Sequence, residues 1–294
     1  MTRSVLHIAA RRILCIAVAL TPALAVQTVC AQRDLPAPYG VHQSPINITN
    51  AEPDSKPLEF GDTSALDKLL TLTLKNTTGK KWCDECGGTT VDQRWGSLKA
   101  TTENKSQIWF GGFSYTLLEF HFHAPAEHLV NSRLTEMEAH YVFKKDLGLP
   151  CGPDTLLVIA QRITAGKENT MLNKIFGGIQ LPVNYHSPAA IVTGFKISDV
   201  IGNLHEQSSY RYEGSLTAPT ADLKDCPNPP GNPNQQLESG YLPEVVSWVL
   251  LVPTIEMSED QITRFQKLFP NGDARGPQAL HPELRRVTLA VPPQ

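Results

Sequence analysis

The spacing of three histidines constrains the fold of this chain more than any other feature. They lie in residues 119–143, which read EFHFHAPAEHLVNSRLTEMEAHYVF. His121 and His123 are separated by one residue, and alternate side chains of a β-strand point to the same face. The pattern therefore predicts a strand that carries Glu119 and both histidines on one face, with the intervening phenylalanines packed on the other.

The end of the same stretch repeats this arrangement. Glu138 and His140 alternate with apolar residues, which predicts a second strand with both polar side chains on one face. Asn131 and Ser132 are residues typical of turns, so the two strands can pair in an antiparallel manner. The sequence thus predicts three imidazoles on one surface of a sheet.

Three neutral imidazoles with a fourth position left open are the ligand set of a catalytic zinc site. Histidines that bind a metal usually donate their second N–H to a carboxylate or a carbonyl group. Glu119 and Glu138 are expected on the correct faces to accept these hydrogen bonds. The alternative, three unrelated histidines, would explain neither the shared face nor the adjacent acids.

Other zinc motifs do not fit the spacing. A protease helix requires H-E-x-x-H, and the segment from His123 to His128 is one residue too long for H-x-x-E-H. Pro125 also argues against a helix that would bring these residues to one side.

Several segments resemble the signature motifs of the α-class carbonic anhydrases. The similarity covers about residues 43 to 290. The segments are QSPINI (43–48), FHFHAPAEH (120–128), EAHYVF (138–143), YRYEGSLTAP (210–219), V-S-W (246–248) and the closing positions Arg275, Gln278, Leu280 and Arg285.

The resemblance implies a mainly β, single-domain fold over residues 32–294. We expect a large, central, twisted and mostly antiparallel sheet with short peripheral helices. The length suits one large domain or two small ones, and 23 prolines and 20 glycines fit many turns between short strands.

The resemblance also implies a function, the reversible hydration of CO2 to bicarbonate and a proton by zinc-bound hydroxide (a carbonate dehydratase, or zinc lyase). It implies Zn²⁺ held by His121, His123 and His140. It further implies Thr217 and Glu127 as catalytic residues, Glu119 and Glu138 as supports of the ligands, and a CO2 pocket formed by Val142, Val158, Leu216, Thr217 and Trp248.

The chain departs from the family at the usual position of its proton-shuttle histidine. Lys80 or Lys81 occupies that place, and no histidine lies between His42 and His121. An unperturbed lysine titrates near ~10.4 and accepts a proton poorly at neutral pH. We therefore expect the shuttle to be missing or supplied elsewhere.

Two further departures are a short leading segment (34–42) and a Pro/Asn-rich insertion (221–243), expected as a surface loop.

Residues 1–31 have the composition of a signal peptide. Arg3, Arg11 and Arg12 precede an apolar run at 13–25, and Val29-Cys30-Ala31 provides a small-residue cleavage site. We expect an exported protein, periplasmic or secreted, without a stable membrane span after cleavage. An uncleaved membrane anchor is the alternative.

Export would place the remaining cysteines in an oxidising compartment. Four cysteines allow two disulfide bonds with three possible connectivities. The interpretation that we favour is a short bridge within C-x-x-C and a longer one, whereas zinc binding or thiol exchange at C-x-x-C is the alternative. The cysteines are Cys83, Cys86, Cys151 and Cys226.

Composition excludes some partners. The formal charge is −3, 41% of the residues are hydrophobic, and the sequence has no run of basic residues that would indicate nucleic-acid binding.

A non-catalytic binding protein with the same fold is the rival class, but such proteins typically lack one or more zinc histidines. An esterase side activity is also compatible with the site. The sequence gives no oligomeric state.

Overall fold

The computed structural model describes most of the unit Arg33–Gln294. The predicted signal peptide, Cys86, Cys151, Cys226 and most of the insertion at 221–243 lie outside the described residues. For Lys80, Lys81 and Cys83 only the backbone is described. The described ranges are 42–55, 59–83, 89–92, 96–147, 154–219, 242–278 and 287–292.

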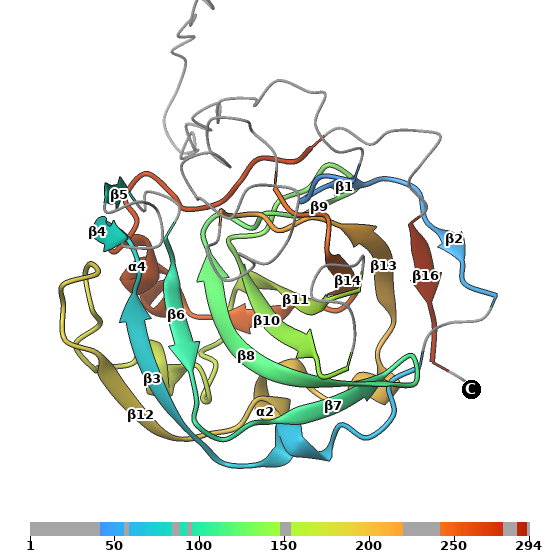
Figure 1. Ribbon diagram of the computed structural model, residues 1–294, viewed down its shortest axis with the longest axis horizontal. Coiled ribbons are helices and arrows are strands. Elements are labelled where there is room, and N and C mark those ends of the chain that lie inside the picture. The colour runs from blue at the N-terminus through green and yellow to red at the C-terminus, as the bar shows by residue number, and fades with distance from the viewer. Residues whose placement is uncertain are drawn as a thin grey trace, which may run out of the picture. The chain divides into compact units, whose positions relative to one another are not determined.

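A 12-stranded sheet forms the centre of this unit (Figure 1). Ten strands follow one another across it, while β7 (Gln107–Phe110) pairs with β8 and β15 (Ile255–Met257) pairs with β11. In spatial order the ten are β12 (Ala190–Phe195), β3 (Leu70–Asn76), β6 (Leu98–Thr101), β8 (Phe113–His123), β10 (Met137–Lys145), β11 (Leu156–Ala165), β14 (Val246–Leu251), β13 (Ser209–Gly214), β16 (Thr288–Ala290) and β2 (Glu52–Pro53).

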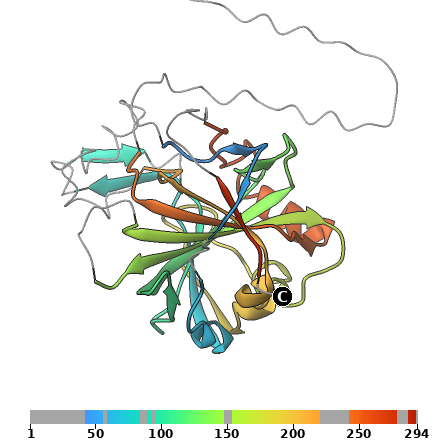
Figure 2. The same ribbon diagram turned by 90° about the vertical axis from the view of Figure 1, so that its right-hand side faces the viewer.

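Most neighbouring strands are antiparallel, and the parallel pairs are β11–β14, β11–β15 and β16–β2. The strands change direction progressively across the sheet, which gives the crossed appearance seen in Figure 2. The predicted mainly β fold with a large, twisted and mostly antiparallel sheet is confirmed.

The remaining elements are small. Two-stranded sheets pair β1 (Asn47–Ile48) with β9 (Leu129–Val130) and β4 (Lys80–Cys83) with β5 (Thr89–Asp92). The short helices are α1 (Asn173–Phe176), α2 (Ser198–Ile201) and α4 (Glu259–Gln266), with 3-10 turns η1 (Ser64–Asp67) and η2 (Leu204–Glu206). None of the helices in the described part of the chain has the length and apolar character that a membrane span requires.

The helix α4 begins as its sequence predicts. The Ser258 hydroxyl accepts a hydrogen bond from the backbone N–H of Gln261 at 3.3 Å, and the Gln261 side chain accepts one from the backbone of Ser258 at 3.0 Å. This capping box satisfies two N–H groups that the helix itself cannot bond.

The two histidine strands lie side by side near the middle of the sheet (Figure 1). The register of β8 and β10 pairs His121 with His140 and His123 with Glu138. The intervening aromatic residues, Phe120 and Phe122, are buried in the large core on the opposite face. The alternation of polar and apolar residues in the sequence therefore gives each strand one polar face and one face in the core, as predicted.

The connection between these strands is more elaborate than a tight hairpin. Asn131 and Ser132 do form a turn, with φ angles of 51° and 60°. This turn follows β9, whose Leu129 donates a backbone hydrogen bond to Ile46 at 3.1 Å. Pairing with the segment around residue 46 holds the connection against the sheet.

The strand β3 begins at Leu70, although the alternation of apolar and polar residues starts near Leu66. The preceding residues form the turn η1, in which Leu66 donates a backbone hydrogen bond to Thr63 at 2.9 Å. Leu66 is nevertheless buried in the large core, so its apolar character serves packing in a turn rather than in a strand.

Gly214, at the end of β13, lies where the backbone approaches neighbouring side chains. A Cβ at this position would lie 2.2 Å from the Ser44 hydroxyl, 2.7 Å from the Tyr212 ring and 2.9 Å from the Trp248 ring. These contacts are too short for any side chain, so only glycine allows the three residues to pack here.

We expect Gly214→Ala to lower the free energy of unfolding by about 1–3 kcal/mol, the usual cost of overpacking. Thermal and chemical denaturation would measure the change. Gly178→Ala is the matched control, because a Cβ there meets no atom within 4 Å. Equal stability of the two variants would contradict the close packing around Gly214.

Candidate metal centre

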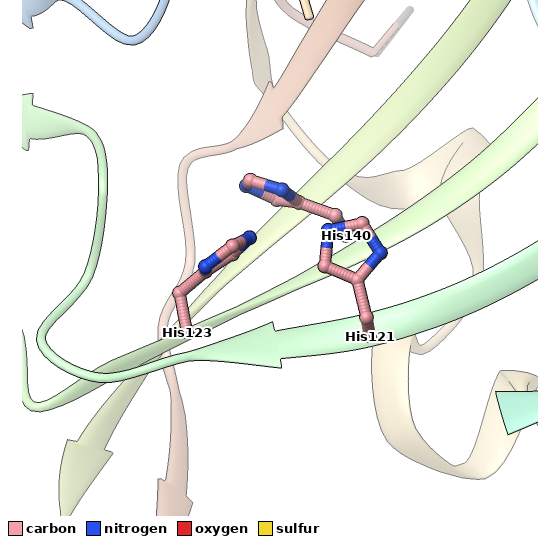
Figure 3. Close-up of side chains that lie close together, drawn as sticks. All are labelled: His121, His123 and His140. Atoms are coloured by element: carbon pink, nitrogen blue, oxygen red, sulfur yellow. The ribbon is translucent and has the colours of Figure 1, made fainter. Parts of the chain in front are cut away.

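The three histidines predicted as ligands converge on one space. Figure 3 shows the rings of His121 and His123, from β8, facing the ring of His140 from β10. Ring centroids are 4.9 Å apart for His121 and His123, 5.2 Å for His121 and His140, and 4.9 Å for His123 and His140. One nitrogen of each ring lies within 4.8 Å of the others.

Carboxylates determine which nitrogen of two rings faces this space. Nδ1 of His121 lies 3.0 Å from both carboxylate oxygens of Glu119. Nε2 of His140 lies 2.7 Å from Oε1 of Glu138. Because a carboxylate accepts a hydrogen bond, these nitrogens carry the protons. Nε2 of His121 and Nδ1 of His140 therefore keep their lone pairs for the shared space.

The third ring is oriented by a backbone carbonyl. Nδ1 of His123 donates to the carbonyl oxygen of Asp273 at 3.3 Å, which leaves Nε2 for the shared space. The Asp273 carboxylate lies on the same side and accepts a hydrogen bond from the backbone N–H of Ala124 at 2.9 Å. Burial raises the pKa of this carboxyl to about 7.

Glu127 is buried at the back of the site, with 1% of its surface exposed. Its Oε1 accepts a hydrogen bond from the backbone N–H of Arg275 at 2.7 Å, and the Thr217 side chain also donates to it. Its Oε2 lies 3.7 Å from Nε2 of His123 and 3.9 Å from Nδ1 of His140.

The residues present fit a metal cation. Nε2 of His123 and Oε2 of Glu127 are both buried and have no hydrogen-bond partner among the described residues. A cation in the space between the three rings would be bound by Nε2 of His123 and would compensate the negative charge of Glu127. Three imidazole nitrogens with a fourth position open are a donor set that zinc accepts.

The electrostatics of the ligands agree with this assignment. Burial lowers the pKa of His121 to about 4, although Glu119 offsets part of the effect, so the ring is neutral at neutral pH. Burial raises the pKa of Glu127, but His123, His140 and the hydrogen bonds from Arg275 and Thr217 lower it below the ordinary value. A neutral imidazole is the form that binds a metal.

Glu138 supports two histidines, of which the sequence predicted one. Its Oε1 accepts from Nδ1 of His128 at 2.6 Å as well as from His140, and its Oε2 accepts from the backbone N–H of His128 at 2.9 Å. Nε2 of His128 lies 2.6 Å from the hydroxyl of Tyr212. The charge and hydrogen bonds of His128 hold the pKa of Glu138 well below its usual range, against the effect of burial.

His128, Glu138 and His140 form a second group whose spacing could hold a metal. Their facing atoms already bond one another at 2.6–2.7 Å, so a cation there would have to break these hydrogen bonds. The first group needs no such rearrangement. We therefore assign His128 and Glu138 to the support of His140.

The residues predicted to line a CO2 pocket lie together. Val142, Val158 and Trp248 are buried in a second apolar cluster, and Leu216 packs against it. Val158 pairs with Val142 on one side and with Trp248 on the other. The Trp248 ring also lies 4.9 Å from the His140 ring, so this wall adjoins the three histidines.

Some residues of the site were missed or had no predicted role in it. No individual role was predicted for His128 or Asp273, and Arg275 was predicted only as part of a closing segment. No local signal marks Asp273, because it meets His123 only through the fold. His186 and His205 are exposed and lie outside the site.

Comparison with known proteins gives consistent matches. The family model of the eukaryotic-type carbonic anhydrases matches residues 30–223. A carbonic anhydrase of Klebsiella pneumoniae is 32% identical over 181 residues, 61% of each chain. One of Pectobacterium atrosepticum is 23% identical over 245 residues, 82% of this chain and 78% of the relative. The match to the K. pneumoniae protein thus spans about three-fifths of that relative's length.

Solved structures show the same fold. An α-carbonic anhydrase from Thermovibrio ammonificans, in complex with the inhibitor sulfanilamide, has a TM-score of 0.60 at 23% identity and covers 85% of this chain and 87% of its own. That of Photobacterium profundum has a TM-score of 0.58 at 22% identity and covers 85% and 89%. Together with the family match over residues 30–223, these comparisons show that the chain belongs to the eukaryotic-type, or α, carbonic anhydrase family.

Proposed function

We propose that this protein is a zinc-dependent carbonic anhydrase that hydrates CO2 reversibly to bicarbonate and a proton. The observation that carries the proposal is the convergence of three imidazole nitrogens beside a buried carboxylate oxygen that lacks a partner among the described residues. Membership in the family supports the same reaction.

His121, His123 and His140 would hold the ion. In the carbonic anhydrases, zinc supplies a hydroxide nucleophile near neutral pH because it lowers the pKa of its water to about 7. The groups behind the rings, Glu119, Glu138 and the carbonyl of Asp273, fix the tautomer and orientation of each imidazole. The protein thus presents three lone pairs to one space.

Thr217 and Glu127 would orient the nucleophile. The lowered pKa of Glu127 keeps it anionic, so it can only accept a hydrogen bond. The Thr217 hydroxyl donates its single proton to Glu127 and can therefore only accept a hydrogen bond from a group in the site. A nucleophile that donates its proton to Thr217 has its lone pair directed away from Thr217, toward the substrate.

The apolar wall suits the substrate. CO2 carries no charge and needs no charged binding group, only an apolar surface next to the nucleophile. Val142, Val158, Leu216 and Trp248 provide this surface beside His140. Export and two disulfide bonds remain predictions, because residues 1–31 and three of the four cysteines lie outside the described part.

Replacement of His140 by Ala is expected to remove bound zinc and abolish hydration, since two imidazoles hold zinc poorly. Metal content of the purified protein and a CO2 hydration assay with metal removed and restored measure both effects. His186→Ala, at an exposed position, is the control and should leave both unchanged. Full zinc occupancy together with full activity in His140→Ala would refute the proposed site.

Replacement of Thr217 by Ala should leave the metal in place but lower kcat/KM by about 100-fold, the cost typical of a misplaced reacting group. Zinc analysis and hydration kinetics would separate the two effects. Thr217→Ser keeps the hydroxyl and should retain most of the rate. An unchanged rate in Thr217→Ala would show that the hydroxyl does not orient the nucleophile.

Proton release is expected to limit turnover in weak buffer. His128, fully buried between Glu138 and Tyr212, has no contact with solvent, and a lysine at position 80 or 81 accepts protons poorly near neutral pH. Imidazole-type buffers should therefore raise kcat and leave kcat/KM nearly constant. Lys80→His should reduce this dependence. A high kcat that is indifferent to buffer concentration would reveal an internal shuttle.

A further inference from the structure

Lys99 stands next to the metal ligands in a row of paired residues across the sheet. The register pairs Lys75 of β3 with Lys99 of β6, Lys99 with His121 of β8, and His121 with His140 of β10. Directly paired residues of neighbouring antiparallel strands point to the same face. Two lysines thus continue the row of ligands toward the edge of the sheet.

The ammonium group of Lys99 reaches the carboxylate that orients His121. Its Nζ lies 3.6 Å from Oε1 of Glu119, and the two side chains are 34% and 12% exposed. The two oxygens of Glu119 lie 3.0 Å from Nδ1 of His121. Ammonium, carboxylate and imidazole therefore form a continuous line of contacts from the solvent to a candidate ligand.

The supports of the three ligands differ in how they are held. Glu138 receives both a ring N–H and a backbone N–H from His128, and the group behind His123 is a backbone carbonyl. The carboxylate of Glu119 instead contacts Nδ1 of His121 and the ammonium group of Lys99, and the hydrogen bonds and ion pairs of the described residues give it no backbone N–H donor. Its orientation therefore depends on one flexible, partly exposed side chain.

We propose that Lys99 is a positioning residue that holds Glu119 against His121 and thereby slows the loss of the metal ion. This inference rests on the proposed zinc site and extends it outward by one residue. The geometry favours it: the Glu119 side chain is only 12% exposed, and a carboxylate removed from water is stabilised by a paired cation. Lys99 supplies the compensating charge at the place where His121 needs its acceptor.

A competing effect has the opposite sign. A cation near a bound zinc ion also repels it, so removal of Lys99 could strengthen metal binding instead. Water reaches the Lys99 side chain, which is 34% exposed, and screens this direct repulsion. The contact with the mostly buried Glu119 is screened less, so we expect the positioning effect to dominate. The sign of the change in metal retention distinguishes the two.

The test measures the release of Zn²⁺ from the full chain to an excess of a strong chelator. Lys99→Met keeps the length of the side chain but removes its charge, and we expect release to become about 10-fold faster, the lower range for the loss of an outer partner of a metal ligand. Lys99→Arg should release zinc at nearly the original rate. Lys75→Met, on the same face one strand farther away, is the matched control.

A double-mutant cycle tests whether Lys99 acts through Glu119. If it does, Lys99→Met has little further effect on zinc release in a Glu119→Gln background, because the charge that it holds is absent. The visible absorption of the cobalt-substituted protein gives a second measurement. The absorption spectrum should change in Lys99→Met and in Glu119→Gln but not in Lys75→Met. A general loss of stability would not change the spectrum in this selective way.

Three results would overturn the inference: unchanged release in Lys99→Met, slower release, or an effect that persists in full in the Glu119→Gln background. In each case the original protein still binds zinc, so the proposed function stands. An original protein that binds no zinc would instead overturn the proposed function, and this inference with it.

Discussion

The register between β8 and β10 is the constraint on which the rest of the site depends. It places His121 opposite His140 and His123 opposite Glu138. Because side chains alternate along a strand, a slip of β8 by one residue would point His121 and His123 toward the core, and a slip of β10 would do the same to His140. Such a slip would bring Phe120 or Phe122 out of the core and bury an imidazole among apolar side chains. The packing of the aromatic face therefore fixes the geometry of the polar face.

Buried negative charge is the second principle of the site. Glu119, Glu127 and Glu138 all have pKa values below the ordinary range, despite burial that acts in the opposite direction. Each is paired with an imidazole or with N–H groups that compensate its charge. Glu119 and Glu138 each bond the outer nitrogen of a ring and so turn its other nitrogen inward, which arranges the site for a cation before any cation arrives.

Local pattern predicted most of the elements that carry the site. The alternation around His121 and His140 depends on residues close together in the chain, and both segments form strands as expected. What the sequence could not provide were partners brought from afar, such as Asp273 behind His123. The pairing of β9 with β1, which replaced the expected simple hairpin, was likewise decided by contacts outside the segment concerned.

The distant origin of these partners determines when the site can be complete. The three histidines are synthesised within a short stretch, but the carbonyl that orients His123 and the N–H that bonds Glu127 come from Asp273 and Arg275, which lie 150 and 148 residues farther along the chain than their partners. Contacts across such a separation form only after a large loop has closed. A nascent chain thus carries all three ligands long before it can orient His123.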